Sequence, residues 1–139
     1  MMTMQQFVAA LEQMQNDMPA IMSELAVSEA QQAVEFSKMI VMQKGKVETG
    51  RYLNGFTHGD AQKDSEGAPA RQNKGICELD VFNNVPYAGR LEYGNQNLAG
   101  TYALATGINM MKQGQQARIN KKLEEALAKY TGGGGKNGA

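Results

Sequence analysis

The sequence predicts an α+β fold in which a small antiparallel β-sheet packs against two long α-helices. Three observations support this. Apolar residues recur every three or four positions near both ends of the chain, apolar and polar residues alternate in its middle, and Gly-, Asn- and Asp-rich segments separate these stretches. A chain of 139 residues is expected to form one domain, here residues 1–131, and residues 132–139 are a Gly-rich tail.

The N-terminal third has the periodicity of an amphipathic helix. Pro19 lacks a backbone N–H and clashes with the preceding turn, so we expect a short helix near 4–16 and a long one near 18–43. The methionines here are expected to fill the core, and an adaptable subunit contact is the alternative. The apolar residues fall on one stripe at alternating spacings of four and three: Phe7, Leu11, Met14, Met18, Ile21 and Leu25.

The middle of the chain is expected to alternate between turns and two strands. The stronger strand covers residues 76–83, where apolar side chains alternate with acidic ones. The other expected elements, in chain order, are a turn at 47–50, a strand at 51–57, a polar loop or long flexible hairpin tip at 58–75, a turn at 83–86, a helical turn or short strand at 87–93, and a polar loop at 94–100.

A second long helix is predicted from about residue 101 to residue 130. Gly107 and Gly114 each weaken it by about 1 kcal/mol relative to Ala, so they indicate a kink or the close approach of another backbone. Its apolar face is formed by Ile108, Met111, Gln115, Ile119, Leu123, Leu127 and Tyr130.

Fourteen basic and fourteen acidic residues give a net charge of zero, which argues against a nucleic-acid binder that works by bulk charge. The charges are nevertheless separated. Residues 1–43 hold five acidic and one basic residue, and residues 112–139 hold six basic and two acidic ones. Opposed ends favour antiparallel packing within a subunit or head-to-tail packing between subunits. Two solvated helix faces that happen to differ are the alternative.

The residue types needed for catalysis or metal binding are scarce. The single His58 is expected to lie exposed in a loop, and the single Cys77 is expected to be a small core residue, so one chain cannot supply a zinc site from them. Residues 45–50 have the glycine spacing of a phosphate loop, but Arg51 and Tyr52 follow where Lys and then Ser or Thr are required. We therefore expect no enzyme, no cofactor and no metal.

Three carboxylates in the second half, Glu78, Asp80 and Glu92, are expected on solvent-facing surfaces. For Glu92 the alternatives are that it caps a turn or pairs with Arg90 or Arg51. The apolar runs are shorter than the roughly 20 residues of a membrane span, and the N-terminus lacks the pattern of a signal peptide. No membrane association is expected.

Two short motifs in the sheet region carry a family resemblance. The first motif covers residues 47–53, and Tyr52 is inserted before its last residue. The second covers residues 87–94, and Asn95 follows it where Thr is usual. Residues 96–100 replace a Pro-rich stretch. Over residues 5–130 the chain resembles the tail-completion, or minor tail and neck, proteins of long-tailed bacteriophages. The matching residues are Val47, Thr49, Gly50 and Leu53 in "Val-x-Thr-Gly-x-Leu", and Tyr87, Ala88, Glu92, Tyr93 and Gly94 in "Tyr-Ala … Glu-Tyr/Phe-Gly-Thr".

The resemblance implies a structural virion protein made in the host cytoplasm. It would be one subunit of a homo-oligomeric ring, six- or twelve-fold, that joins the head connector to the tail tube without catalysis. Its neighbours would be the tail terminator, head-closure or connector, and tail-tube proteins. Non-specific contact with DNA in the channel is possible, and Lys136 of the tail is a candidate for it or for an acidic patch.

Other functions remain open at this point. The nearest alternative is a tail terminator or head-closure connector protein. An alternative of another class is a small regulatory or nucleic-acid-binding module, for which a pI above about 9 would be the sign; here the pI is 6.6. The motif residues themselves are expected to have structural roles: Gly50 permits a sharp reversal, and Tyr87 and Tyr93 are expected to be half-buried.

Overall fold

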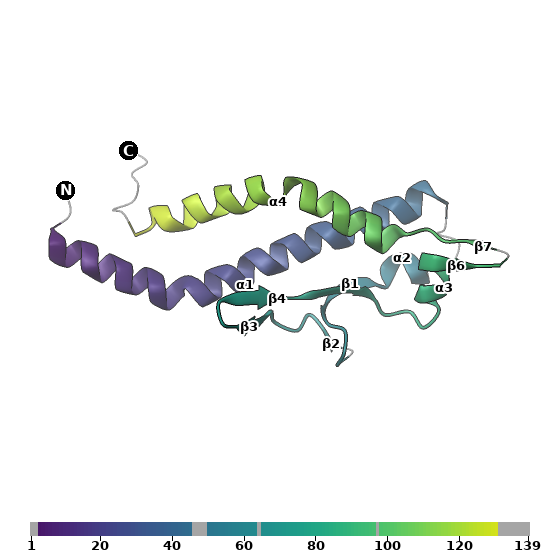
Figure 1. Cartoon of the computed structure of the whole chain (residues 1–139), viewed down its shortest axis with the longest axis horizontal. Helices are drawn as coiled ribbons and strands as arrows, with labels where there is room; N and C mark the ends of the chain where they lie inside the picture. Colours follow the sequence, from purple (N-terminus) through teal and green to yellow (C-terminus); the bar gives the residue numbers. More distant parts are fainter. Residues whose placement is uncertain (1–2, 46–49, 64, 97, 131–139) are drawn as a thin grey trace.

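The computed structural model describes residues 3–45, 50–63, 65–96 and 98–130. This part of the chain is a mixture of helix and sheet, which confirms the predicted α+β class (Figure 1). The helices are α1 (Met4–Gln43), α2 (Arg51–Asn54), α3 (Ala88–Tyr93) and α4 (Ala103–Ala128). The strands are β1 (Phe56–Asp60), β2 (Ser65–Glu66), β3 (Arg71–Asn73), β4 (Ile76–Glu78), β5 (Asp80–Asn83), β6 (Gly94–Asn95) and β7 (Leu98–Ala99).

Helix α1 is continuous through Pro19, so the predicted division into two helices is wrong. Its N-terminus is fixed by a capping box, in which Thr3 and Gln6 exchange hydrogen bonds between side chain and backbone. Pro19 and Gln15 are exposed, so water can satisfy the Gln15 carbonyl, which lacks a helical donor. The helix bends in its purple N-terminal part (Figure 1), as a proline within a helix causes.

The segment after the first motif is a helical turn, although a strand was expected over residues 51–57. Gly50 has a φ of 76°, a left-handed conformation that glycine tolerates, and its carbonyl accepts the N–H of Asn54 at 2.9 Å. This confirms the sharp reversal at Gly50. It also places Tyr52 inside the molecule and delays the start of β1 to Phe56.

A three-stranded antiparallel sheet forms the second layer, with the order β2-β1-β5. In its central pair Phe56 lies opposite Asn83, and His58 lies opposite Val81. The predicted strand at 76–83 is interrupted at Leu79, because β4 pairs with β3 whereas β5 pairs with β1. One continuous strand was therefore the wrong prediction.

Segments 58–75 and 94–100 were expected to lack strands, but both contain short ones. Both predictions are therefore wrong. Strands β3 and β4 form a hairpin whose two-residue turn has Lys74 at φ 53° and Gly75 at φ 80°, the conformation that matches strand twist. Strands β6 and β7 pair at Gly94 and Ala99. Between the sheet and α4, the helical alternative for residues 87–93 is confirmed by α3.

Helices α1 and α4 run antiparallel and side by side (Figure 1). Three non-covalent contacts along their length show that the helices are antiparallel. Gly107 lies against Ser37, Arg118 binds Glu29, and Tyr130 binds Asp17. A Cβ atom on Gly107 would be 2.7 Å from the Ser37 nitrogen and 2.9 Å from the Ala33 oxygen, which confirms the predicted close approach of a backbone. The packing of oppositely charged segments within the subunit is also confirmed.

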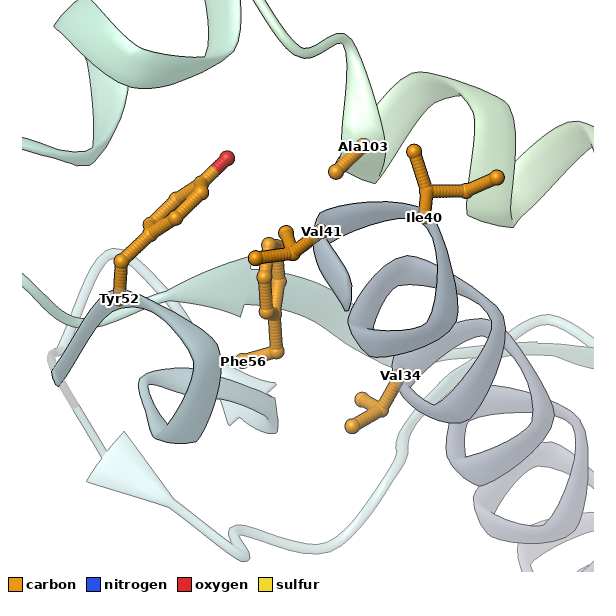
Figure 2. Packing of buried hydrophobic residues seen from close by; sticks show 6 residues of the cluster. All are labelled: Val34, Ile40, Val41, Tyr52, Phe56 and Ala103. Atoms are coloured by element: carbon orange, nitrogen blue, oxygen red, sulfur yellow. The ribbon is translucent and has the colours of Figure 1, made fainter. Parts of the chain in front are cut away.

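The hydrophobic core lies at the end of the molecule where the sheet and α2 meet the helices. Figure 2 shows its buried side chains converging from α1, α2, β1 and α4. The rings of Tyr52 and Phe56 pack with centroids 5.1 Å apart. The cluster consists of Val34, Ile40, Val41, Tyr52, Phe56 and Ala103.

Candidate functional site

The structure brings the two sequence motifs together at the end of the molecule that holds the core. Leu53 from the first motif, and Tyr87 and Ala88 from the second, pack against the same buried cluster. The guanidinium of Arg51 lies 5.7 Å from the centre of the Tyr87 ring, a cation–π contact. Tyr87 is half-buried, as predicted. The candidates Val47, Thr49 and Lys136 lie outside the described residues.

Glu92 is buried, with 6 % of its surface exposed, so the prediction that it faces solvent is wrong and the prediction that it caps is confirmed. Its two carboxylate oxygens accept the backbone N–H groups of Leu104 at 2.9 Å and Ala105 at 3.1 Å. N–H groups in the first turn of a helix have no acceptor within the helix, and Glu92 supplies one for these two. A negative charge at this end also interacts favourably with the helix dipole. Glu92 therefore joins α3 to α4.

A second polar connection supports the same junction. The Tyr52 hydroxyl and the Thr101 hydroxyl lie 2.9 Å apart, and Thr101 Oγ1 also accepts the N–H of Ala103 at 3.3 Å. Burial raises the pKa of Tyr52. Through these contacts α2 and α3 fix the start of α4, with Glu92 of the second motif and Tyr52, the residue inserted in the first.

The second motif ends in an exposed aromatic pair. Tyr93 is 70 % exposed, so the prediction that it is half-buried is wrong. Its ring meets that of Tyr102 edge to face, with centroids 6.2 Å apart. Gly94 ends α3 with a φ of 81°, a conformation that explains glycine at this position.

The remaining acidic candidates form a surface ion cluster. Asp80 is half-buried rather than fully solvent-facing, and its Oδ1 accepts Arg71 Nη2 at 2.9 Å. The Arg71 hydrogen bond is the main cause that lowers the pKa of Asp80. Asp60 lies 3.7 Å from Arg71 Nη1. Glu78 is exposed, as expected.

His58 lies on β1, half-buried, and not in an exposed loop as predicted. Its Nδ1 atom is buried and has no hydrogen-bond partner among the residues that the structure describes. Within the described ranges, no three side chains of His, Cys, Asp or Glu gather in a way that could hold a metal ion. Nor does any helix in that part of the chain have the length and apolarity to cross a membrane.

The feature that sequence reasoning missed is an exposed apolar surface on the N-terminal part of α1. This part extends beyond the C-terminal end of α4 (Figure 1), and the last described link between the helices is the hydrogen bond from Tyr130 to Asp17. The exposed fractions are 74 % for Met4, 50 % for Phe7, 44 % for Val8 and 45 % for Leu11. We call these four residues the N-terminal stripe.

The same face of α1 continues into a groove between α1 and α4. The groove has a volume of about 540 Å³ and an almost wholly apolar lining. Cys77 from β4 also lines it, so this cysteine is half-buried at a groove wall and not in the core as predicted. We call this the apolar groove; its main apolar wall residues are Met18, Met22, Leu25, Ile119, Leu123 and Leu127.

A second groove along the same helix pair has a different chemistry. Its volume is about 650 Å³, and charged residues of both signs line it, including Asp17, Glu24, Lys122 and Lys129. The hydrogen bond from Tyr130 is the main cause that lowers the pKa of Asp17. Between the helices Arg118 binds Glu29 through two hydrogen bonds, of 2.6 and 2.8 Å. Charge pairing thus links the two helices, and the apolar groove remains open between them.

The arrangement is suited to binding an apolar helical surface. A stripe at helical spacing and an apolar groove between two helices are the two halves of a helix-in-groove contact. No protein-family model, curated protein or solved structure matches this chain.

Proposed function

We propose that this protein is a structural subunit of a homo-oligomeric ring in the neck of a long-tailed bacteriophage, where the ring joins the head connector to the tail tube. The observation that carries the proposal is the helix pair, which extends away from the core, exposes the N-terminal stripe and forms the apolar groove. Contiguous exposed apolar surface of this kind typically marks a protein–protein contact.

The dimensions of the molecule support a role in assembly. At a rise of 1.5 Å per residue, the 40 residues of α1 span about 60 Å, a long element for a chain of this size. The core occupies only one end of that length. A helix that reaches beyond its own core exposes surface that a neighbouring subunit can bury.

The family resemblance supports the choice of the neck over other assemblies. The described residues of both motifs lie at the core end, where Glu92 and the inserted Tyr52 fix the start of α4. In this proposal the core end is a rigid base, and the helix pair is the surface presented to neighbouring subunits. The sequence motifs then specify how the helix pair is held.

The test is to locate the protein in the particle. A symmetry-averaged cryo-electron microscopy map of the neck is expected to show six or twelve copies in a ring between connector and tail tube. Particles from a phage lacking the gene should be heads and tails that fail to join. A single asymmetric copy per particle, or absence from purified virions, would contradict the proposal.

A further inference from the structure

The N-terminal stripe has the spacing of a helical ligand. Met4, Phe7, Val8 and Leu11 occupy positions i, i+3, i+4 and i+7 of one helix, which is the pattern by which an amphipathic helix enters an apolar groove. All four are exposed, and the capping box at Thr3 stabilises the turn that presents them. The stripe is therefore preformed, which reduces the entropy lost on binding.

The apolar groove has the features of the matching receptor. Met18, Met22 and Leu25 form one wall, and the apolar residues of α4 form the other. Methionine side chains adapt to the shape of what they bind, because their thioether stems are unbranched and polarisable. Its volume of about 540 Å³ lies within the ordinary range for binding pockets.

The stripe and the groove of one chain cannot meet. The stripe and one wall of the groove belong to the same continuous helix, α1, so the helix would have to fold back on itself. Nor does the sequence of residues 131–139, which contains Thr, Gly, Lys, Asn and Ala, supply a large apolar side chain to fill the groove. The occupant that this chain itself offers is the stripe of a second copy.

Charge favours the groove over a second stripe as the binding site. Residues 3–28 carry Glu12, Asp17 and Glu24 and no basic residue, whereas residues 112–130 carry five basic and two acidic residues. Two stripes placed together would bring acidic segments side by side. A stripe placed in the groove has the basic α4 as one of its two neighbours, although Lys122 and Lys129 themselves line the charged groove and not the apolar one.

From these features we propose that the N-terminal stripe of one copy lies in the apolar groove of the next copy. The inference rests on the proposed function, since it supplies the contact between copies that a ring requires. The two surfaces differ, so the contact is heterologous: each bound copy leaves a free groove and a free stripe, and the series ends when a ring closes.

Cys77 gives a direct test, because it lines the groove. The double variant Phe7→Cys with Cys77→Ser is mixed with the unmodified chain, which has Cys77 but no cysteine on the stripe, and the mixture is oxidised. We expect a disulfide between position 7 and Cys77, identified by mass spectrometry of the joined peptides. Within one chain Phe7 lies about 17 Å from Met18 along α1, too far for a disulfide between the stripe and the groove.

The alternatives give different products. The double variant alone would form a 7–7 dimer if stripes pair with stripes, and that result without a 7–77 product would overturn the inference. Absence of any stripe-to-groove disulfide in the concentrated mixture would overturn it as well. If the protein forms a ring in the virion and this disulfide is still absent, the inference fails and the proposed function stands. If the disulfide forms and virions lack the protein, the proposed function fails.

A matched pair of charge substitutions measures the strength of the contact. Leu11→Glu places a carboxylate in the stripe, and Ala9→Glu places the same charge on the opposite, exposed face of the same helix. We expect Leu11→Glu to weaken self-association at least about tenfold in sedimentation equilibrium, and Ala9→Glu less than about twofold. Equal effects of the two substitutions would contradict a contact through the stripe.

Discussion

The two ends of α1 carry the same kind of apolar periodicity but differ in what covers it. Near its C-terminus, Val41 is fully buried and Val34 is 7 % exposed, because β1 and β5 cover one side of the helix and α4 covers another. Near its N-terminus, Phe7 is 50 % exposed and α4 no longer accompanies the helix. The difference lies in the number of layers and not in the hydrophobicity of the segment.

This comparison shows why two helices alone do not complete a fold here. An apolar stripe becomes a core only when elements on more than one side exclude water from it. The core end has helices, a sheet and the turns α2 and α3. The helix pair beyond it is formed by residues 4–28 and 115–128. The β3–β4 hairpin contacts it on one side only, where Gln72 binds the carbonyl of Pro19 and Cys77 lines the apolar groove, and among the described residues nothing covers its tip. We call this helix pair the arm.

The largest expected difference in stability is between a substitution in the core and one in the arm. Phe56→Ala removes a ring that is 3 % exposed in the core, and we expect it to lower the free energy of unfolding by about 3–5 kcal/mol. Phe7→Ala in the arm should lower it by less than about 1 kcal/mol in the dilute, free subunit. Urea unfolding followed by circular dichroism measures both. Similar losses in the two variants would mean that the arm belongs to the core.

A second pair compares two glycines of α4. Gly107→Ala puts a Cβ against the backbone of α1, so the helices must separate, and we expect a loss of about 1–3 kcal/mol. At Gly114 the Cβ would be 2.5 Å from Nη1 of Arg118, the end of a flexible side chain. There the gain in helix propensity offsets the shift of Arg118, and the change should stay within about 1 kcal/mol. The melting temperatures of the two variants measure the difference. A melting temperature for Gly114→Ala below that of Gly107→Ala would contradict the expectation.

The junction between α3 and α4 should have an intermediate effect. Glu92→Ala leaves the N–H groups of Leu104 and Ala105 without their acceptor, at a cost of about 1–2 kcal/mol. The matched control is Glu124→Ala on the exposed face of α4, which should change stability by less than about 0.5 kcal/mol. If both variants unfold at the same urea concentration, Glu92 is not a structural cap.

The smallest effect concerns the last link of the arm. The Tyr130 hydroxyl lowers the pKa of Asp17, so Tyr130→Phe should raise that pKa toward its ordinary value. A carboxyl with a lowered folded pKa stabilises the fold above its unfolded pKa of 3.8, and the stabilisation is lost as pH falls through the folded pKa. The unmodified chain should lose this contribution below about pH 4, and the variant should lose less, because only the hydrogen bond from Gln13 then lowers the Asp17 pKa. Carboxyl chemical shifts followed by NMR during an acid titration measure it; an unchanged Asp17 pKa would contradict the link.

Helical periodicity predicted α4 well, because it depends on residue types repeated over many turns, and the opposed charges of the two ends favoured the antiparallel packing within the subunit as one of two options. The periodicity failed at Pro19, where a proline on an exposed helix face has only a local cost, since water replaces the missing partner. It also failed at residues 51–54, because the φ of Gly50 decides between a helical turn and a strand. Short apolar segments carry too little periodicity to make that choice.

The candidate site was predictable only in part. Glu92 belongs to a short motif that precedes α4 in the sequence. Its burial depends on tertiary contacts with α4, which no local pattern contains. Of the N-terminal stripe, the helical periodicity identified Phe7 and Leu11 but not Met4 and Val8, and it did not show that this face is exposed. Whether a stripe is covered depends on where the partner helix ends in space, and spacing along one helix says nothing about that.

The central claim is that the core end is complete in one chain and that the arm is completed by a second copy. Native-state hydrogen exchange on dilute protein and on protein concentrated until it self-associates tests this most directly. We expect exchange to slow on association in residues 4–28 and 115–128, and to stay unchanged in β1, β5 and residues 33–41 of α1. Equal protection of the arm in both samples, or slowing confined to the core end, would contradict the account.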